Sequence, residues 1–175
     1  SSSAWNIFIG EGSGMNNSGG YETFTLFLPG GGSTTAYSSW GGNNVAIGAY
    51  TGVNLKGDFL HKDYGNSNVM VGHYSGFSLE TGYRNTIIGN GAGYSLASGH
   101  GNVFLGYNAG AQETGSNKLY IANSNTTTPL IYGDFDLGIL TVHGSQTISN
   151  AVPALLLYTQ SGEAGRKSAV YLYGT

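Results

Sequence analysis

The sequence predicts an all-β chain whose main part is a parallel β-solenoid. Three observations lead to this fold class. A nine-residue template recurs along the chain, each copy holds an apolar run of only three residues, and each run ends at a small residue, glycine in five copies. Recurrence at a short spacing is typical of structural units that stack on their neighbours. An apolar run of three residues is too short for a helical pattern but suits a short strand.

The template consists of Asn, three mostly apolar residues, Gly, two variable residues, a small residue and Gly. A sixth, imperfect copy begins at Lys118, where Lys replaces Asn and Ala122 replaces Gly. The starts at 44, 68, 85, 102 and 118 are 24, 17, 17 and 16 residues apart. We call a strand together with the segment that leads to the next copy a rung. The five clear copies are residues 6–14 (NIFIGEGSG), 44–52 (NVAIGAYTG), 68–76 (NVMVGHYSG), 85–93 (NTIIGNGAG) and 102–110 (NVFLGYNAG).

Each part of the rung has an expected role. The glycine after the strand lies at a corner, where the chain needs a positive φ or a close approach between backbones. The asparagine is expected to hydrogen-bond the backbone at the turn and to stack on the asparagine of the next rung. The leucine of the following segment is expected to point inward, as at Leu55, Leu79 and Leu96. The structural rung positions are therefore Asn6, Gly10, Asn44, Gly48, Asn68, Gly72, Asn85, Gly89, Asn102 and Gly106.

The strands are apolar on both faces. Alternate side chains of a strand face opposite sides. We assign the first and third apolar residues of each strand to the core of the coil, and the middle ones (Phe8, Ala46, Met70, Ile87, Phe104 and Tyr120) to the outside. Strands that are apolar on both sides are normally covered on both sides. The sequence contains no expected helix that could cover the outer side, so another copy of the chain is the simplest cover. The core set comprises Ile7 with Ile9, Val45 with Ile47, Val69 with Val71, and Val103 with Leu105.

With this pattern the repeats resemble the head repeats of YadA-type trimeric autotransporter adhesins, and similar repeats in phage tail fibres. In that family three chains each wind a left-handed parallel β-roll around a threefold axis. The resemblance therefore implies a left-handed β-roll in an intertwined or side-by-side homotrimer. It covers roughly residues 1–125, and the rungs here are longer than is usual in the family.

The rest of the chain departs from the template. Residues 15–43 hold a degenerate rung and a loop, and the longest insertion lies at residues 58–64. After residue 125 the period stops, and four strands are expected at 129–135, 139–142, 154–158 and 168–173. The prediction is a β-roll head or shaft domain at 1–125, followed by a second β module at 126–175 that forms a neck or the start of the next fibre segment.

Composition excludes several classes. Charged residues make up 9% of the chain and the net charge is −3, so there is no basic surface for nucleic acid. The chain has no cysteine, which removes disulfides and thiolate metal sites. It also has no apolar stretch of about 18 residues, so we expect no direct membrane insertion.

The sequence contains only incomplete matches to motifs for cofactor binding and catalysis. Residues 162–168 lack the second glycine of a phosphate-binding loop, and residues 89–93 repeat as a corner rather than opening a helix. The four histidines are scattered; His73 near a trimer axis could supply three metal ligands, but a surface histidine is the preferred interpretation. Asp58 and Asp63 could be a carboxylate pair, but a solvated loop is preferred. We therefore expect no enzyme activity, no metal and no cofactor.

Receptor binding is the functional signal that remains. The insertion at 58–64 is the densest cluster of charge, and insertions of this kind often carry binding. Corner tyrosines have rings with a polar tip, which suit either stacking on sugars or packing between subunits, and the sequence does not separate these two roles. The possible receptor-binding residues are Trp40, Tyr50, Asp58, His61, Lys62, Asp63, Tyr64, Tyr74 and Tyr107, with Tyr94 also at a corner.

The sequence thus favours a structural segment of a homotrimeric extracellular fibre. Its partners are expected to be two further copies of itself and a glycan or protein receptor on a host surface. A phage tail fibre taking part in host attachment is slightly preferred over a bacterial cell-surface adhesin, because the period gives way to a β module rather than to heptads. The alternative from another class is a monomeric glycan- or ice-binding β-solenoid.

Overall fold

The computed structural model describes residues 6–14, 25–27, 33–35, 42–57, 61 and 63–144. Over these residues the chain is all-β and contains no helix. Eight strands form one sheet in the order β1-β4-β5-β6-β7-β8-β9-β10. A separate antiparallel pair is formed by β2 (Thr25–Phe27) and β3 (Ser33–Thr35). Ser1–Gly144 make up one compact unit and Ser145–Thr175 a second.

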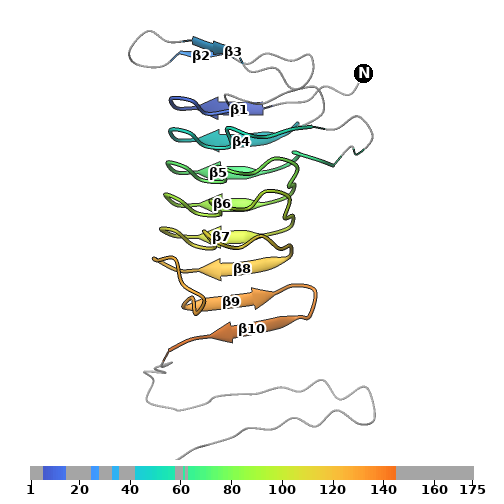
Figure 1. The fold of residues 1–175 in the computed structure, drawn as a ribbon, viewed down its shortest axis with the longest axis vertical. Coiled ribbons are helices and arrows are strands. Elements are labelled where there is room, and N and C mark those ends of the chain that lie inside the picture. Colours follow the sequence, from blue (N-terminus) through green and yellow to red (C-terminus); the bar gives the residue numbers. More distant parts are fainter. Residues whose placement is uncertain are drawn as a thin grey trace, which may run out of the picture. The chain divides into compact units, whose positions relative to one another are not determined.

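Six strands of the large sheet are parallel and hold the six copies of the template (Figure 1). Each pairs with the next in step, so the position after the asparagine forms one column from Ile7 through Val45 and Val69 to Leu119. Because the template is the same in each copy, equivalent residues of neighbouring strands lie opposite one another in the sheet. The six strands are β1 (Asn6–Ile9), β4 (Asn44–Ile47), β5 (Val69–Val71), β6 (Thr86–Ile88), β7 (Val103–Leu105) and β8 (Lys118–Ile121).

Two antiparallel strands continue the same sheet. β9 (Ile131–Asp134) pairs with β8, and β10 (Ile139–Val142) pairs with β9. These strands confirm the two expected at 129–135 and 139–142. The strands expected at 154–158 and 168–173 lie outside the described residues. The domain boundary after residue 125 stays a prediction; β9 and β10 belong to the compact unit that ends at Gly144.

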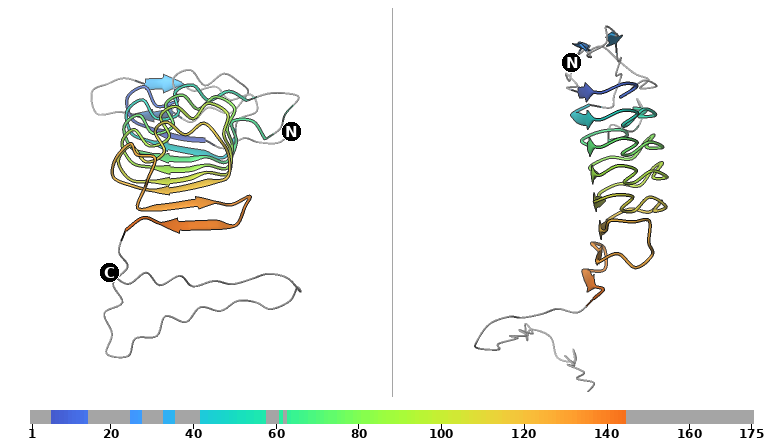
Figure 2. Two further views of the ribbon diagram at one scale, coloured as in Figure 1. Left: turned by 60° about the horizontal axis from the view of Figure 1, so that its bottom comes forward. Right: turned by 90° about the vertical axis from the view of Figure 1, so that its left-hand side faces the viewer.

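Tight corners turn each parallel strand into a return segment on one side of the sheet (Figure 2). Gly72 has a φ of 132°, and a Cβ there would lie 2.6 Å from the carbonyl carbon of Gly89 in the next rung. Only glycine allows the rungs to approach so closely. The return segments are bonded to one another as well, since Gly76 N donates to Ala92 O at 3.0 Å and Ser95 N donates to Ala111 O at 3.0 Å.

The core lies between the sheet and the return segments, and it corrects the predicted faces. Ala46, Met70, Ile87 and Phe104 are fully buried, and Phe8 and Tyr120 pack against this core partly buried, whereas we expected all six on the outside. The set assigned to the core faces outward instead: Ile7, Ile47 and Val69 are 44%, 37% and 37% exposed. The inward leucines were predicted correctly, since Leu55, Leu79 and Leu96 are fully buried against the middle strand residues.

A ladder of buried asparagines explains why the faces are arranged in this way. Asn44 is buried at the start of β4, and side chains two residues apart in a strand share a face, so Ala46 must also point inward. The expected stacking of asparagines is confirmed. In each step one side chain accepts two hydrogen bonds from the next asparagine: Asn85 Oδ1 accepts from Asn102 N at 3.0 Å and from Asn102 Nδ2 at 3.1 Å.

Each ladder asparagine from Asn44 onward also ties down the segment that leads to the next rung. Asn85 Nδ2 donates to Gly99 O at 2.9 Å, and Asn68 Nδ2 donates to Gly82 O at 3.0 Å. The same side chain thus fixes the strand register, the closing turn and the inward face. Buried amides are stable only when their donors and acceptors are bonded, as they are here. The ladder comprises Asn6, Asn44, Asn68, Asn85 and Asn102.

Replacing a central ladder residue is expected to destabilise the fold strongly. Asn85→Ala takes their side-chain partner from two backbone groups, Gly99 O and Asn102 N, and each unsatisfied buried group costs about 1–3 kcal/mol. It also removes one of the two hydrogen bonds that Asn68 Oδ1 accepts. We expect a loss of about 3 kcal/mol or more in the free energy of unfolding, measured by denaturant titration at fixed protein concentration.

Asn90→Ala provides the matched control, because Asn90 is exposed at the corner of the same rung. We expect a change within about 0.5 kcal/mol for it. Equal effects of the two substitutions would contradict the role given to the ladder.

Candidate functional site

The outward side of the six parallel strands is a continuous apolar surface. It consists of two columns of side chains in register, and Thr86 is the one polar member of the twelve described here. Ile88 in the middle of the stack is 40% exposed. We call this surface the outer face. Its members are Ile7, Ile9, Val45, Ile47, Val69, Val71, Thr86, Ile88, Val103, Leu105, Leu119 and Ile121.

The antiparallel strands extend the apolar surface beyond β8. Ile121, Ile131 and Val142 lie in one column. Leu137 and Leu140 are 70% and 67% exposed. Large exposed apolar areas on a soluble chain mark interaction surfaces. Because the core is complete without it, the outer face is free to pack against something other than this chain's own return segments.

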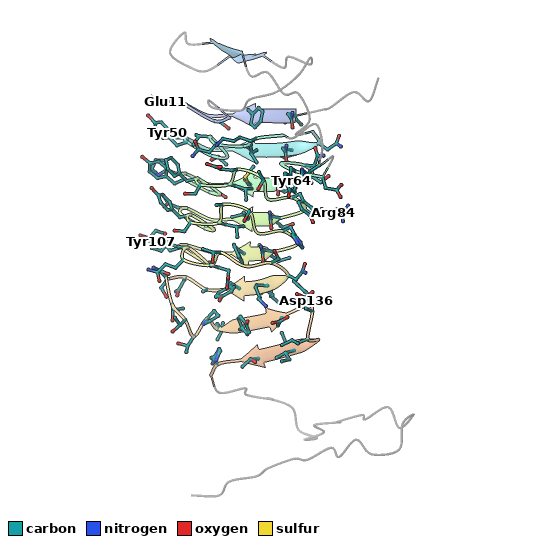
Figure 3. The ribbon with its side chains drawn as sticks, turned by 45° about the vertical axis from the view of Figure 1, so that its right-hand side comes forward. Glu11, Tyr50, Tyr64, Arg84, Tyr107 and Asp136 are labelled. Carbon is teal, nitrogen blue, oxygen red and sulfur yellow. The ribbon has the colours of Figure 1, made fainter. Side chains whose placement is uncertain are left out.

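A second feature lies along the edge where the parallel strands end. Five rings from three successive rungs contact one another there: Tyr50, His73, Tyr74, Phe77 and Tyr94. We call them the corner aromatic cluster. Tyr50 stacks on Tyr74 with centroids 5.4 Å apart, and Phe77 stacks on Tyr94 at 5.0 Å. Tyr50 and Tyr107 mark this edge in Figure 3, away from the edge that carries Tyr64 and Arg84.

Two tyrosines of the cluster have an unfavourable backbone conformation. Tyr50 and Tyr74 have φ values of 53° and 56°, in the left-handed region. The equivalent corner position is Gly12, Gly91 or Asn108 in the other rungs. A bulky side chain there costs about 1–2 kcal/mol, and each aromatic contact returns about 0.5–1.5 kcal/mol, so the several ring contacts of Tyr74 offset its strain. The corner itself does not require tyrosine, because glycine or asparagine adopts the same conformation in the other rungs.

Part of the predicted receptor-binding set lies on the opposite edge. The rings of His61 and Tyr64 stack with centroids 4.4 Å apart, and Asp63 forms an ion pair with Arg84 at 3.4 Å. The Asp63 and Arg84 side chains are well exposed, so this pair contributes little to stability. Arg84 also lies over the ring of Tyr83, which stacks on His100.

The predicted residues therefore separate into two groups. Tyr50 and Tyr74 lie together in the corner aromatic cluster, and Tyr107 is 57% exposed further along the same edge. His61, Asp63 and Tyr64 lie on the other edge, and Trp40, Asp58 and Lys62 lie outside the described residues. Receptor binding by any of them stays a prediction.

Sequence reasoning did not place two members of the cluster at a binding surface. His73 was weighed as a metal ligand and as a surface histidine, the preferred interpretation, and Phe77 was given no binding role. The ring of His73 lies 3.9 Å from that of Tyr74, and its Nδ1 lies 3.5 Å from Asn90 Nδ2. The sequence did contain a signal for this cluster. His73 and Phe77, like Tyr74, come within a few residues after the corner glycine Gly72.

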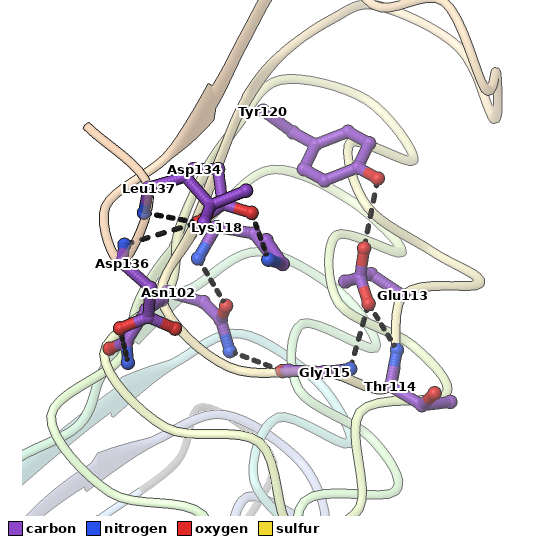
Figure 4. Close-up of polar contacts among 10 residues, drawn as sticks. Asn102, Glu113, Thr114, Gly115, Lys118, Tyr120, Asp134, Asp136 and Leu137 are labelled. Carbon is purple, nitrogen blue, oxygen red and sulfur yellow. Dashed lines mark hydrogen bonds and ion pairs between the residues drawn. The ribbon is translucent and has the colours of Figure 1, made fainter. Parts of the chain in front are cut away.

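The end of the asparagine ladder carries a pair of opposite charges (Figure 4). Lys118 N donates to Asn102 Oδ1 at 2.9 Å, so the ladder ends on this backbone. Lys118 Nζ donates to Asp134 Oδ2 at 2.5 Å across the β8–β9 pair. The Lys118 ammonium lowers the pKa of Asp134, and the Asp134 carboxylate raises the pKa of Lys118.

A hydrogen-bonded tyrosine closes the core beside this pair (Figure 4). Tyr120 packs edge-on against Phe104 and Tyr132, and its hydroxyl donates to Glu113 Oε2 at 2.9 Å. Burial raises the pKa of Tyr120, and the bond to Glu113 adds to the shift. The other carboxylate oxygen of Glu113 accepts from Thr114 N and Gly115 N. These contacts explain the capping of the stack and offer no catalytic geometry.

Comparison with other proteins and with metal or membrane signatures adds no assignment. The chain matches no protein-family model, no curated protein and no solved structure. Among the residues that the structure describes, no three His, Cys, Asp or Glu side chains gather as metal ligands. No helix in that part of the chain is long and apolar enough to cross a membrane.

The Lys118–Asp134 pair predicts a specific pH dependence. Because the pKa of Asp134 is lowered in the folded chain, its contribution is present above the ordinary value of 3.8 and is lost as the pH falls through the folded pKa. Asp134→Asn removes the charge but keeps an oxygen for Asp136 N and Leu137 N. We expect wild type to melt at a higher temperature than the variant near pH 6, with the gap closing below pH 4.

The pair also loses its contribution to stability at high pH. Because the pKa of Lys118 is raised in the folded chain, this contribution is complete below the ordinary value of 10.5 and is lost as the pH rises through the folded pKa. Asp136→Asn is a suitable control, since Asp136 is exposed, its charge has the smallest of the effects on the pKa of Lys118, and asparagine keeps an oxygen for Asn117 Nδ2. A gap between wild type and Asp134→Asn that stays constant from pH 6 to pH 2 would show that the pair does not stabilise the cap.

Proposed function

We propose that this chain is a structural segment of a homotrimeric extracellular fibre that takes part in attachment to a host surface. In this proposal the rungs wind as a left-handed parallel β-solenoid, and three chains pack through their outer faces. The observation that carries the proposal is the outer face itself: a second apolar surface on strands whose first surface is already buried in the core.

A second copy of the chain is the simplest cover for this face. Parallel sheets are normally buried on both faces, and the described residues contain no helix that could cover the outer one. Exposed or half-buried Ile, Val and Leu in register along six strands offer a repetitive surface that can match an identical surface. The resemblance to trimeric adhesin heads favours three copies around an axis over two.

A trimer of this kind supports attachment through rigidity and multivalency. Six parallel strands spaced about 4.8 Å apart span about 24 Å, held by the asparagine ladder along their length. Three identical flanks on one shaft raise avidity without a strong single site. A phage tail fibre is our first candidate and a bacterial cell-surface trimeric adhesin the second, because the repeats give way to further β-strands rather than to heptads.

The mass in solution tests the proposal directly. Light scattering of the full chain is expected to give about three times 18.2 kDa. Ile47→Glu with Ile88→Glu places two carboxylates in one column of the outer face without touching the core. We expect this double variant to lose the trimer, because burying unpaired charges between subunits is strongly unfavourable.

Ser98→Glu with Gln112→Glu is the charge-matched control, because both residues are exposed on the return segments. It should keep the mass of the wild type. A monomeric wild-type chain would overturn the proposal and favour the monomeric binding solenoid. A stable dimer would contradict the threefold arrangement, while a double variant that still assembles would show that the interface lies elsewhere.

A further inference from the structure

The corner aromatic cluster has the chemistry of a carbohydrate-binding surface. Its four Tyr and Phe rings present apolar faces, and the three tyrosines add hydroxyl groups at their tips. Tyr94 is 40% exposed and His73 is exposed as well, so part of the cluster is open to solvent. The cluster lies at the ends of the strands rather than on the outer face, so packing of outer faces would leave it at the flank.

The rung after Tyr74 changes the character of this edge from aromatic to polar. Its left-handed corner position is Gly91, which has no side chain to continue the ring stack. The Asn108 side chain of the next rung lies over Gly91, where its Oδ1 occupies the space of a Cβ. Asn90 brings a second amide beside His73. Ring faces bordered by amide groups are the combination that binds sugars, whose C–H faces stack while their hydroxyls hydrogen-bond.

The choice of residue at this corner adds an independent argument. Three other rungs fill the same left-handed position with Gly12, Gly91 or Asn108, so the corner does not require a ring. Tyrosines in two adjacent rungs therefore concentrate ring surface at one place on this edge.

We propose that the corner aromatic cluster binds an uncharged glycan, with Tyr74 and Tyr94 supplying ring faces and Asn90 and Asn108 supplying amide contacts. The inference rests on the proposed attachment function and names its ligand class. An uncharged glycan is favoured over an acidic one because the cluster contains no Lys or Arg; the exposed Arg84 lies on the opposite edge (Figure 3).

The test uses the full chain on an array of neutral hexose and N-acetylhexosamine oligosaccharides, with sialylated and uronic-acid glycans on the same slide. Tyr74→Asn removes a ring but keeps a residue that tolerates the left-handed conformation. Tyr94→Ser removes the most exposed tyrosine of the cluster. We expect wild type to bind neutral glycans, and each variant to bind at least tenfold more weakly with unchanged mass and a melting temperature that is not lowered by more than a few degrees.

Tyr64→Asn is the matched control, because it removes a stacked tyrosine from the opposite edge. It should bind as wild type does. The inference is overturned if the wild-type trimer binds no neutral glycan, if it binds only acidic ones, or if Tyr64→Asn loses binding while Tyr74→Asn and Tyr94→Ser keep it. Those results leave the trimeric fibre standing. A monomer that still binds neutral glycans through Tyr74 would overturn the fibre and keep the site.

Discussion

The buried asparagine ladder is the constraint on which the rest of the structure depends. Each amide accepts from the next rung with its oxygen, and from Asn44 onward each donates to the turn that closes its own rung with its nitrogen. Because these groups lie inside, an unmatched rung would leave polar atoms buried without partners, which is far more costly than losing a surface contact. Register, turn position and strand orientation are thereby set together by one residue type at one position.

The ladder also determines which side chains of each strand face the core and which face outward. With the asparagine inward, the residue two places later fills the core, where the sizes of Ala46, Met70, Ile87 and Phe104 differ widely. Such variation suits an irregular interior packed against leucines from the return segments. The outward positions are more uniform, nearly all Val, Ile or Leu. Uniform side chains in register make a regular surface, and our proposal of contact between identical chains depends on this regularity.

The sequence was sufficient for the repeat, the corners and the inward leucines, because these depend on spacing and on the special conformations of glycine. It misassigned the two faces of the strands, since three apolar residues in a row carry no alternation to distinguish them. The buried asparagine held that information: its own burial fixes Met70 two residues after Asn68 as inward. The aromatic cluster was only partly foreseen, because contacts between Tyr74, Phe77 and Tyr94 depend on how side chains lean between rungs. The pairing of Lys118 with Asp134 required knowledge that the sheet turns antiparallel after β8.

That change of direction shows how the stack is ended. A ladder asparagine at position 118 would offer an oxygen to a further parallel rung, whereas Lys118 has only donors and directs its ammonium to Asp134. Ala122 replaces the corner glycine at the same place, and its Cβ would occupy the space in which the backbone of the next rung lies at the glycine corners, as that of Gly89 does at Gly72. Parallel rungs therefore stop at β8 for a local chemical reason, and β9 and β10 continue the sheet with antiparallel pairing. The length of the parallel stack at this end is thus set by residues 118 and 122, where side chains depart from the template.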